Sequence, residues 1–419
     1  MLTRRNLLKT SGLVALEAVS SRSSFATLTK PTLPDRENFR VQEFETCLNA
    51  GRWHPLSNRA RAAVNRYHEY KQRGIWDRTS IETPNNPNMH GGSQPEARAL
   101  FAKLINATPA EIAFVPSTTA GENLVVQSLG LPAPGKNIVT DGLHFEGSLY
   151  LYDALRKQGA DVRVVKPHDW RVDLADFERV IDKNTALVAV SLISFINGYE
   201  HDLKALCKLA HERGALVYAD IVQAAGAMPI DVRELDVDFC ASASYKWLMG
   251  DFGVGFLYAS QALLNGRIVR PVHSYRQVNG YETHMFPGDP AGSNDISWTQ
   301  IPTAAGHFET GTIASAVTET LAYSLNYIQT LGVDSIRKHS QTMIDQMRRE
   351  IPKLGHECIT PTDVNGPLVA FYLKDPAAID AKLKAAKVDV TISGNRMRVS
   401  PSVYNDASDI DRLLRALAS

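Results

Sequence analysis

Residues 215–259 read ALVYADIVQAAGAMPIDVRELDVDFCASASYKWLMGDFGVGFLYA and carry the clearest fold signal of the chain. The stretch contains three short apolar runs, Ala215 to Asp220, Val237 to Ala243 and Gly253 to Ala259, each bounded by turn residues. Such runs, separated by amphipathic segments, are typical of strands that are buried on both faces of a parallel sheet. The last two runs leave no room for a long helix between them, which makes the third a candidate antiparallel strand.

The same pattern occurs upstream. Four further β-branched runs alternate with helical patterns, at Glu111 to Val115, Asn137 to Asp141, Asp161 to Lys166 and Thr185 to Ile193. Seven runs in this alternation predict an α/β fold in which helices cover both faces of a mainly parallel, seven-stranded sheet.

The C-terminal part has a different pattern. Apolar residues recur at helical spacing from Thr312 to about Ile351. Beyond them, Leu368 to Leu373, Ala377 to Ala386 and Arg396 to Val399 predict a strand, a helix and a strand of a small α+β domain. We therefore predict an N-terminal segment (27–60) that packs on the small domain, a large domain (61–310), and a linking helix with the small domain (311–419).

Composition excludes several classes of function. The chain has 419 residues, enough for two domains, and its 45 basic and 45 acidic residues balance, which does not favour nucleic acid or an anionic membrane as partner. Its four cysteines, Cys47, Cys207, Cys240 and Cys358, lie far apart and form no close pair of the kind that metal or redox sites use. We expect buried free thiols and no metal site.

The N-terminus resembles a twin-arginine export signal. Arg4 and Arg5 precede a short, mostly apolar stretch and a small-residue cleavage site that ends at Ala26, although Glu17 places a charge inside the apolar stretch. The stretch is shorter than the ~20 residues that cross a bilayer, so no membrane span is expected. Residues 1–26 are predicted to be a signal peptide that the twin-arginine machinery reads, with a periplasmic mature protein, and a cytoplasmic one as the alternative.

Polar residues directly after the predicted strands are the first candidates for a site, because ligands of open α/β sheets bind at the carboxyl ends of strands. The segment Ser117 to Asn123 follows the first strand and opens a helix, whose free N–H groups and hydroxyls form a potential phosphate site, although an ordinary helix cap looks the same. Asp220 ends another strand, and Gln223 follows it. A buried carboxylate there is suited to a protonated pyridine nitrogen.

Lys246 lies among apolar residues, in the run Ser242 to Leu248, at the exit of the next strand. Partial burial lowers the pKa of an amine, and the uncharged amine is the form that forms a Schiff base with an aldehyde. On position alone, a lysine there can equally extend its ammonium to solvent without a role.

Six landmarks in register give the run from about residue 90 to 405 a specific resemblance. The chain resembles the class V aminotransferases of the fold-type I enzymes that use pyridoxal 5′-phosphate (PLP), a superfamily that includes cysteine desulfurases, kynureninase and isopenicillin N epimerase-like proteins. The landmarks are Phe114-Val115-Pro116-Ser117-Thr118-Thr119 with Asn123-Leu124, His144, Asp220 with Gln223, Ser244-Tyr245-Lys246-Trp247, Phe308-Glu309-Thr310-Gly311-Thr312, and Arg398-Val399-Ser400-Pro401 with Tyr404-Asn405.

The resemblance implies PLP as cofactor and a homodimer. It implies that Lys246 forms the Schiff base and moves protons and that Asp220 binds the pyridinium nitrogen. His144, or its neighbour Phe145, stacks on the ring, and Gln223 contacts the ring oxygen.

The remaining roles implied by the resemblance concern the phosphate and the substrate. Arg398, with Arg396 as the fallback, binds a substrate carboxylate. The cofactor phosphate is held by Thr118, Thr119 and Tyr245, with Ser244 also among the cofactor-binding residues, and by Gly311 and Thr312 of the partner subunit.

The chain also departs from the desulfurases of this superfamily. No cysteine lies between Val388 and Arg398, where desulfurases carry the thiol that accepts sulfur, and Phe195 stands where they have an asparagine. Cys358 lies well upstream of that loop. A desulfurase that stores a persulfide on this loop is therefore disfavoured, and the phenylalanine resembles epimerase-like members.

The expected function is that of a PLP enzyme for a small-molecule or peptide substrate that bears amino and carboxylate groups. Transamination, or a related proton transfer with Lys246 as acid and base, is the first expectation, and a lyase or epimerase is the alternative. A non-catalytic binding protein on the same fold is the alternative of another class, which intact Lys246 and Asp220 disfavour. An exported enzyme of this type resembles those that tailor the side chain of pyoverdine siderophores.

Overall fold

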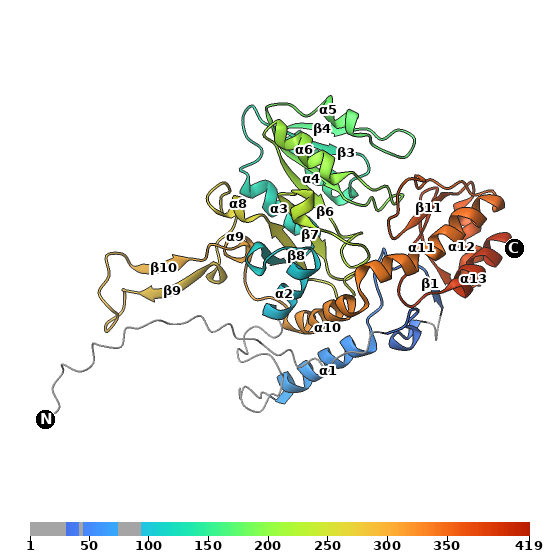
Figure 1. Ribbon diagram of the computed structural model, residues 1–419. Helices are drawn as coiled ribbons and strands as arrows, with labels where there is room; N and C mark the ends of the chain where they lie inside the picture. The colour runs from blue at the N-terminus through green and yellow to red at the C-terminus, as the bar shows by residue number, and fades with distance from the viewer. Residues whose placement is uncertain (1–30, 42–44, 74–93) are drawn as a thin grey trace.

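A seven-stranded sheet forms the centre of the computed structural model, which describes residues 31–41, 45–73 and 94–419 (Figure 1). The predicted α/β fold is confirmed, and each of the seven predicted runs forms a strand of this sheet. The strands are β2 (Ile112–Val115), β3 (Asn137–Asp141), β4 (Asp161–Val165), β5 (Thr185–Ser191), β6 (Leu216–Asp220), β7 (Phe239–Ala243) and β8 (Gly255–Ala259).

The sheet is mainly parallel, as predicted. Its order is β2-β8-β7-β6-β5-β3-β4, and β8 alone runs antiparallel to its neighbours. Parallel strands from β7 to β4 direct their carboxyl ends to one edge of the sheet, so residues that follow these strands are brought together there.

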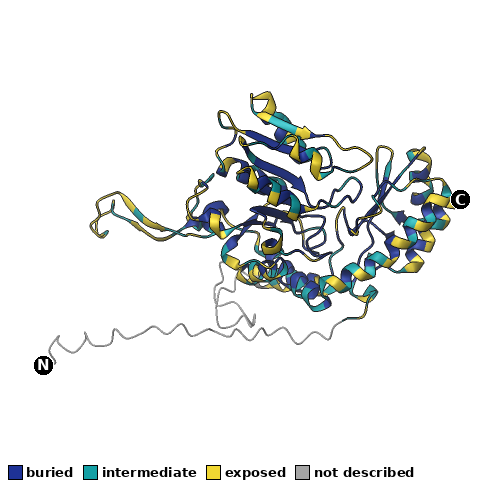
Figure 2. Ribbon diagram, turned by 45° about the horizontal axis from the view of Figure 1, so that its top comes forward, coloured by how far each residue is buried: buried dark blue, intermediate teal, exposed yellow. Residues whose placement is uncertain are grey.

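Helices cover both faces of the sheet, and alternate residues of one strand enter different cores. In β5, Val188 and Val190 join the larger apolar cluster, whereas Leu187 and Ala189 join the cluster on the other face. Apart from the edge strand β4, the strands of the sheet are buried throughout most of their length (Figure 2). The covering helices include α2 (Gln94–Leu104), α3 (Thr118–Ser128), α4 (Glu146–Lys157), α5 (Leu174–Glu178), α6 (Leu203–Glu212) and α7 (Val232–Leu235).

A second, smaller core lies at the C-terminal end of the chain. Its three-stranded antiparallel sheet has the order β11-β14-β13, and it packs with the helices α11, α12 and α13. The N-terminal strand β1 pairs in parallel with β12 of this part. The elements are β1 (Thr46–Cys47), α11 (Val333–Glu350), β11 (Val369–Tyr372), α12 (Pro376–Ala385), β12 (Val388–Asp389), β13 (Thr391–Ser393), β14 (Arg396–Val399) and α13 (Ala407–Ala418).

The long helical region between the two cores is divided at Gly332, which has a positive φ of 79°. The first helix, α10 (Ser315–Leu331), inserts Leu321 and Leu325 into the core of the large sheet, whereas α11 inserts Met343 and other side chains into the small core. Between these two cores, Leu331 of α10 and Ile336 of α11 share a further apolar cluster, so the packing changes gradually around Gly332. The division at residue 311 stays a prediction.

Several elements were not predicted from the sequence. The hairpin of β9 (Val278–Thr283) and β10 (Ile296–Gln300) projects from the body of the molecule (Figure 1) and is mostly exposed (Figure 2). The helix α1 (Asn58–Arg73) packs along α10. The two strands of the hairpin bury neither face, so their sequence lacks the apolar runs that predicted the other strands.

Among the described residues, no helix is long and apolar enough to cross a membrane. The predicted signal peptide, residues 1–26, lies outside the described part of the chain.

Candidate active site

Lys246 lies in a tight turn at the carboxyl end of β7. Ser244 closes the turn, because its N–H donates to Val254 O and its carbonyl accepts from Gly250 N. Gly226 is required beside the turn: its φ is +96°, and a Cβ there would lie 2.3 Å from Trp247 O. The backbone around Lys246 is therefore fixed on both sides.

The amine of Lys246 is poised for chemistry. Burial lowers its pKa to about 8, although the charge of Asp220 acts in the opposite direction. Among the described residues, Nζ forms no hydrogen bond or ion pair, and it lies 5.7 Å from the ring centre of Tyr245. An amine with this pKa is partly uncharged near neutral pH, which nucleophilic attack on an aldehyde requires.

Asp220 ends β6, the strand next to β7, and pairs in register with Ala241. Its Oδ1 accepts the N–H of Val222 at 2.9 Å. Burial raises the pKa of this carboxyl to about 6, against the opposing charges of His144 and Lys246. Asp220 and Lys246 thus lie at neighbouring strand ends, close enough that each charge shifts the pKa of the other.

His144 follows β3 and is completely buried. Its Nδ1 lies 2.8 Å from Ser191 Oγ, and Ser191 is the register partner of Asp220, so the imidazole lies beside Asp220. Phe145 instead packs edge-on against Phe195, with ring centres 5.4 Å apart. His144 therefore contacts the polar strand ends, and Phe145 belongs to an aromatic pair next to them.

The predicted phosphate site begins at the N-terminus of α3. Thr118 Oγ1 accepts the N–H of Ala243, just before Lys246 in the chain, at 3.0 Å, so α3 is attached to the end of β7. The hydroxyl hydrogen of Thr118 stays available for an anion, and Thr119 lies beside it in the same first turn. Tyr245 stacks on Phe252 with ring centres 4.6 Å apart.

Ser244 has a structural role that the sequence did not indicate. Its hydroxyl donates to Asp251 O at 2.5 Å and is completely buried. A serine hydroxyl has one hydrogen, which here closes the turn, and the contact of Ser244 with the cofactor stays a prediction.

Gln223 has a larger structural role than the sequence indicated. Its Nε2 donates to Gly51 O at 2.9 Å, and its Oε1 accepts from Trp247 Nε1 at 3.0 Å. One amide hydrogen remains for a cofactor oxygen. Gln223 thus joins the N-terminal segment to the turn of Lys246, a contact that the backbone bond from His54 N to Tyr245 O reinforces.

Arg398, on β14, is 7 % exposed and has no carboxylate partner among the described residues. Its guanidinium donates to Phe195 O at 2.7 Å and Thr391 Oγ1 at 3.1 Å, and its Nε is buried without a partner. Burial, with the charge of Arg52, lowers the pKa of Arg398 to about 10. A buried cation without a counter-ion is suited to an anionic ligand, and the partly exposed Arg396 lacks this burial.

Gly311 and Thr312 are exposed in the single chain. Gly311 N donates to Ser274 Oγ, and the hydroxyls of Thr312 and Tyr275 lie 3.1 Å apart. The two residues therefore lie on the surface, where a second subunit has access to them.

These residues fit PLP. Lys246 offers a weakly basic amine for the aldehyde, Asp220 is a buried carboxylate without an ion pair among the described residues, and the first turn of α3 offers N–H groups to the phosphate. Arg398 would then hold the carboxylate of a substrate.

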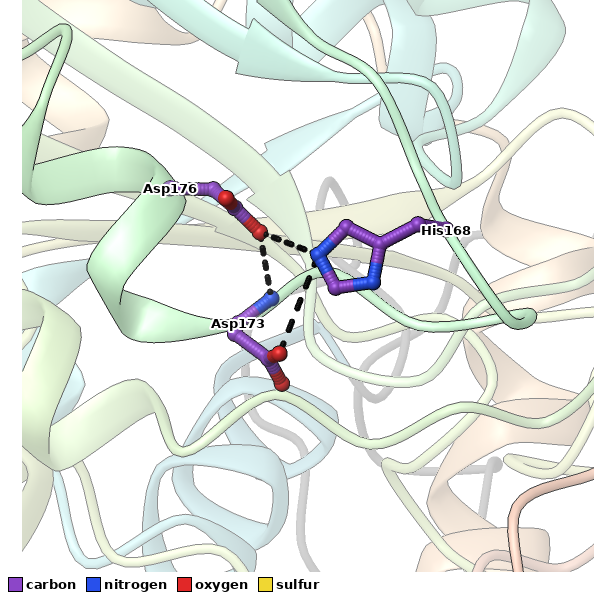
Figure 3. A group of neighbouring side chains, drawn as sticks. All are labelled: His168, Asp173 and Asp176. Atoms are coloured by element: carbon purple, nitrogen blue, oxygen red, sulfur yellow. Dashed lines mark hydrogen bonds and ion pairs between the residues drawn. The ribbon is translucent and has the colours of Figure 1, made fainter.

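One described group of side chains has the composition of a metal site: His168, Asp173 and Asp176 (Figure 3). His168 Nε2 lies 2.8 Å from Asp176 and 3.8 Å from Asp173. Each carboxylate also pairs with an arginine, Asp173 with Arg171 and Asp176 with Arg179. The two aspartates form the capping box of α5, which accounts for the cluster without an ion.

The four cysteines are free thiols, as expected, and three are buried. Burial raises the pKa of all four, to about 11 for Cys47, so none is an activated thiolate. The loop between β13 and β14 carries no cysteine, and Cys358 Sγ faces the Thr360 carbonyl at 3.6 Å.

Sequence reasoning missed residues whose role depends on contacts across the chain. Gly51 approaches Gln223 and Ser400, and Thr391 orients Arg398. Glu122, completely buried in α3, contacts His144. The only sequence feature that indicated Glu122 was its position as an acidic residue in the polar segment Ser117 to Asn123, at the start of a helix.

Comparisons with known proteins show the family of the chain. The family described as "Aminotransferase class-V" matches residues 89–413. A cysteine desulfurase of Dickeya dadantii is 33% identical over 352 residues, which cover 77% of this chain and 80% of that protein.

Solved structures of a cysteine desulfurase and of a cystine C–S lyase share the fold. The apo cysteine desulfurase of Thermococcus onnurineus has a TM-score of 0.78 at 21% identity, covering 93% of this chain and 98% of that one. The cystine C–S lyase C-DES has a TM-score of 0.77 at 23% identity in a mutant whose PLP carries covalently linked glycine, covering 92% of this chain and 99% of that one.

Proposed function

Because the chain belongs to the class V aminotransferase family and is a PLP-dependent enzyme, we propose that it acts on the amino group of an amino-acid-like or peptide-borne substrate. Bound PLP supplies an electron sink for negative charge at the substrate carbon. The observation that carries the proposal is the position of Lys246 and Asp220 on neighbouring strand ends, beside the unpaired cation of Arg398.

Three residues have separate roles in the proposed reaction. Asp220 holds the ring nitrogen protonated, and Arg398 orients the substrate through its carboxylate. Lys246, with its pKa near 8, takes a proton from the substrate carbon and returns it at a different atom. Transamination or a related proton transfer needs no further acid or base.

The experiment that tests this function incubates the PLP-loaded protein with candidate amino acids in D2O. Proton transfer by Lys246 predicts deuterium at the α-carbon and a 2-oxo acid with an unchanged carbon chain. The variant Lys246→Ala is the control. Absence of deuterium exchange from every amino acid and siderophore peptide tried would contradict the proposal.

A C–S lyase is the second candidate, favoured by the likeness to C-DES and by relatives that are cysteine desulfurases. It predicts pyruvate and a persulfide from cystine in the same assay. The missing loop cysteine and the raised thiol pKa values disfavour storage of the sulfur on this protein.

A homodimer is part of the proposal. The exposed Gly311 and Thr312 support it, because the resemblance gives them a role at the phosphate of a partner subunit. The hairpin of β9 and β10 exposes Tyr281, Phe286 and Trp298, and aromatic side chains in such number are typical of protein contacts. Sedimentation analysis should find a dimer, and a fully active monomer would contradict this assignment.

Export to the periplasm and a role in pyoverdine maturation complete the proposal. The support is the order of Arg4, Arg5 and the apolar stretch up to Ala26, and the twin-arginine route transports folded proteins that can carry a preloaded cofactor. Mass spectrometry of exported peptides from cells with and without the gene tests the role. An unchanged peptide profile, or a cytoplasmic protein with an intact N-terminus, would contradict it.

A further inference from the structure

A buried acid lies behind His144 and has no role in the reaction as described so far. Glu122, in α3, is completely inaccessible to solvent, as is His144. Its Oε1 accepts Tyr152 OH at 2.7 Å and lies 3.0 Å from His144 Nε2, while the hydroxyl of Ser148 donates to Oε2. The side chains of Ser148 and Tyr152 in α4, and of His144 just before α4, thus all contact one carboxylate.

These contacts fix the proton on one nitrogen of His144. A carboxylate only accepts hydrogen bonds, so with Ser148 and Tyr152 as donors, Glu122 requires His144 Nε2 to carry a hydrogen. Nδ1 is engaged with Ser191 at 2.8 Å. Both ring nitrogens are therefore bound to protein, and the imidazole has no nitrogen left to exchange a proton with a substrate.

The charge balance favours the imidazolium. A buried carboxylate is costly without a cation, and His144 is the only base in contact with Glu122 among the described residues. Burial by itself lowers the pKa of His144, but the negative charges around it raise that pKa overall. The titratable groups that face this pair are Asp141 with its own partner His201, Asp220, Tyr152 and Tyr218.

We propose that Glu122 is a positioning residue that keeps His144 as an imidazolium, so that His144 supplies fixed positive charge beside Asp220 and the cofactor ring and transfers no proton. The proposal rests on the proposed PLP chemistry and narrows the role of His144. Lys246 is then left as the group that moves protons.

The first test needs no substitution at Glu122. The full-length, PLP-loaded protein is labelled with 15N-histidine, and the His144 signals are assigned by their loss in His144→Gln. Two protonated ring nitrogens that do not titrate between pH 6.5 and 9 are expected. A neutral imidazole, or titration inside that range, would overturn the proposal.

The second test uses the visible absorption of PLP bound to Lys246. In Glu122→Gln the amide carbonyl can still accept a hydrogen bond from His144 Nε2. The negative charge that stabilises the imidazolium is gone, so His144 should become neutral. Loss of the nearby positive charge favours protonation of the lysine-bound nitrogen, so the midpoint of the absorption change should rise by about one pH unit. Glu122→Asp keeps the negative charge, so its midpoint should lie close to that of the wild type.

Matched controls separate position from folding. Glu146→Gln changes an exposed acid of α4 and should leave the midpoint unchanged. Tyr152→Phe removes one hydrogen bond to Glu122 but no charge, and should shift the midpoint little. A folded Glu122→Gln with an unshifted midpoint overturns the role of Glu122 alone, whereas a wild-type protein without any PLP band overturns the proposed function itself.

Discussion

The two sides of the candidate site are built in different ways. The sheet side consists of Asp220, the last residue of β6, and of His144 and Lys246, which follow β3 and β7. The cross-domain side consists of Gly51 and Arg398, which lie almost 350 positions apart and reach the site from segments outside the large sheet. The sheet side needs only the parallel arrangement of strands, whereas the cross-domain side exists only when both cores are in place.

The joints between the two sides are few and polar. Gln223 binds Gly51 O, and Arg398 binds Phe195 O, in the loop after β5. Gly51 N also donates to Ser400 Oγ at 2.9 Å, so the N-terminal segment links the small domain to the turn of Lys246. We infer that chemistry depends on the sheet side and substrate selection on the cross-domain side.

The largest expected effect is on the sheet side. Lys246→Ala removes both the attachment of PLP and the proton carrier, so turnover should fall by at least ~10³-fold, within the range of general acid–base catalysis. The fold should persist, because Nζ makes no bond to the protein among the described residues. Turnover and the visible spectrum measure the effect. Lys208→Ala, at an exposed lysine, is the control, and turnover retained in Lys246→Ala would refute the assignment.

Arg398→Ala tests the cross-domain side. Loss of charge-assisted hydrogen bonds of ~1.5–3 kcal/mol should weaken the binding of carboxylate substrates about 10- to 100-fold, with PLP still bound. Titration of the PLP absorption with amino acids gives the dissociation constants. Arg396→Ala is the matched control on the same strand, and equal losses in both variants would show that Arg398 is not the specific carboxylate ligand.

The pH dependence of cofactor capture sharpens the comparison, because the charge of Arg398 on the cross-domain side also acts on the pKa of Lys246 on the sheet side. Burial lowers the pKa of Lys246 to about 8, and the uncharged amine is the reactive form. The rate of PLP binding to the apoprotein should therefore rise about tenfold from pH 7 to 9 and level off above that. Stopped-flow absorbance measures the rate. Because the charge of Arg398 also lowers the pKa of Lys246, Arg398→Ala should move this profile to higher pH. A rate that keeps rising to pH 10.5 would indicate an ordinary lysine.

The smallest expected effect concerns the joint itself. Gln223→Ala leaves Gly51 O and Trp247 Nε1 buried without partners, which should cost ~1–3 kcal/mol of unfolding free energy. Denaturant unfolding measures the loss, and the exposed Gln127→Ala should have no effect. If Gln223→Ala is as stable as the wild type, the N-terminal segment is held by other contacts.

The sheet side was predictable because its information is local. Apolar runs bounded by turn residues identified all seven strands. Asp220 ends β6 and Lys246 follows β7, so both lie at the shared edge of the sheet. The partners of Ser244 and Gln223 could not be predicted from the sequence. The residue type shows which hydrogen bonds a side chain can form, but not with which partner it forms them. The hydroxyl of Ser244 donates to Asp251 O, and the amide of Gln223 forms hydrogen bonds with Gly51 O and Trp247 Nε1.

By itself, the amino-acid sequence determined the strand pattern, the single antiparallel strand and the lysine–aspartate pair, because side-chain periodicity and strand ends follow from neighbours along the chain. The tertiary structure alone decided that Arg398 is buried without a counter-ion among the residues that the structure describes, that Glu122 contacts His144, and that β9 and β10 project as a hairpin. These features depend on contacts between residues distant in sequence, and a buried charge acquires its meaning only from the groups that surround it.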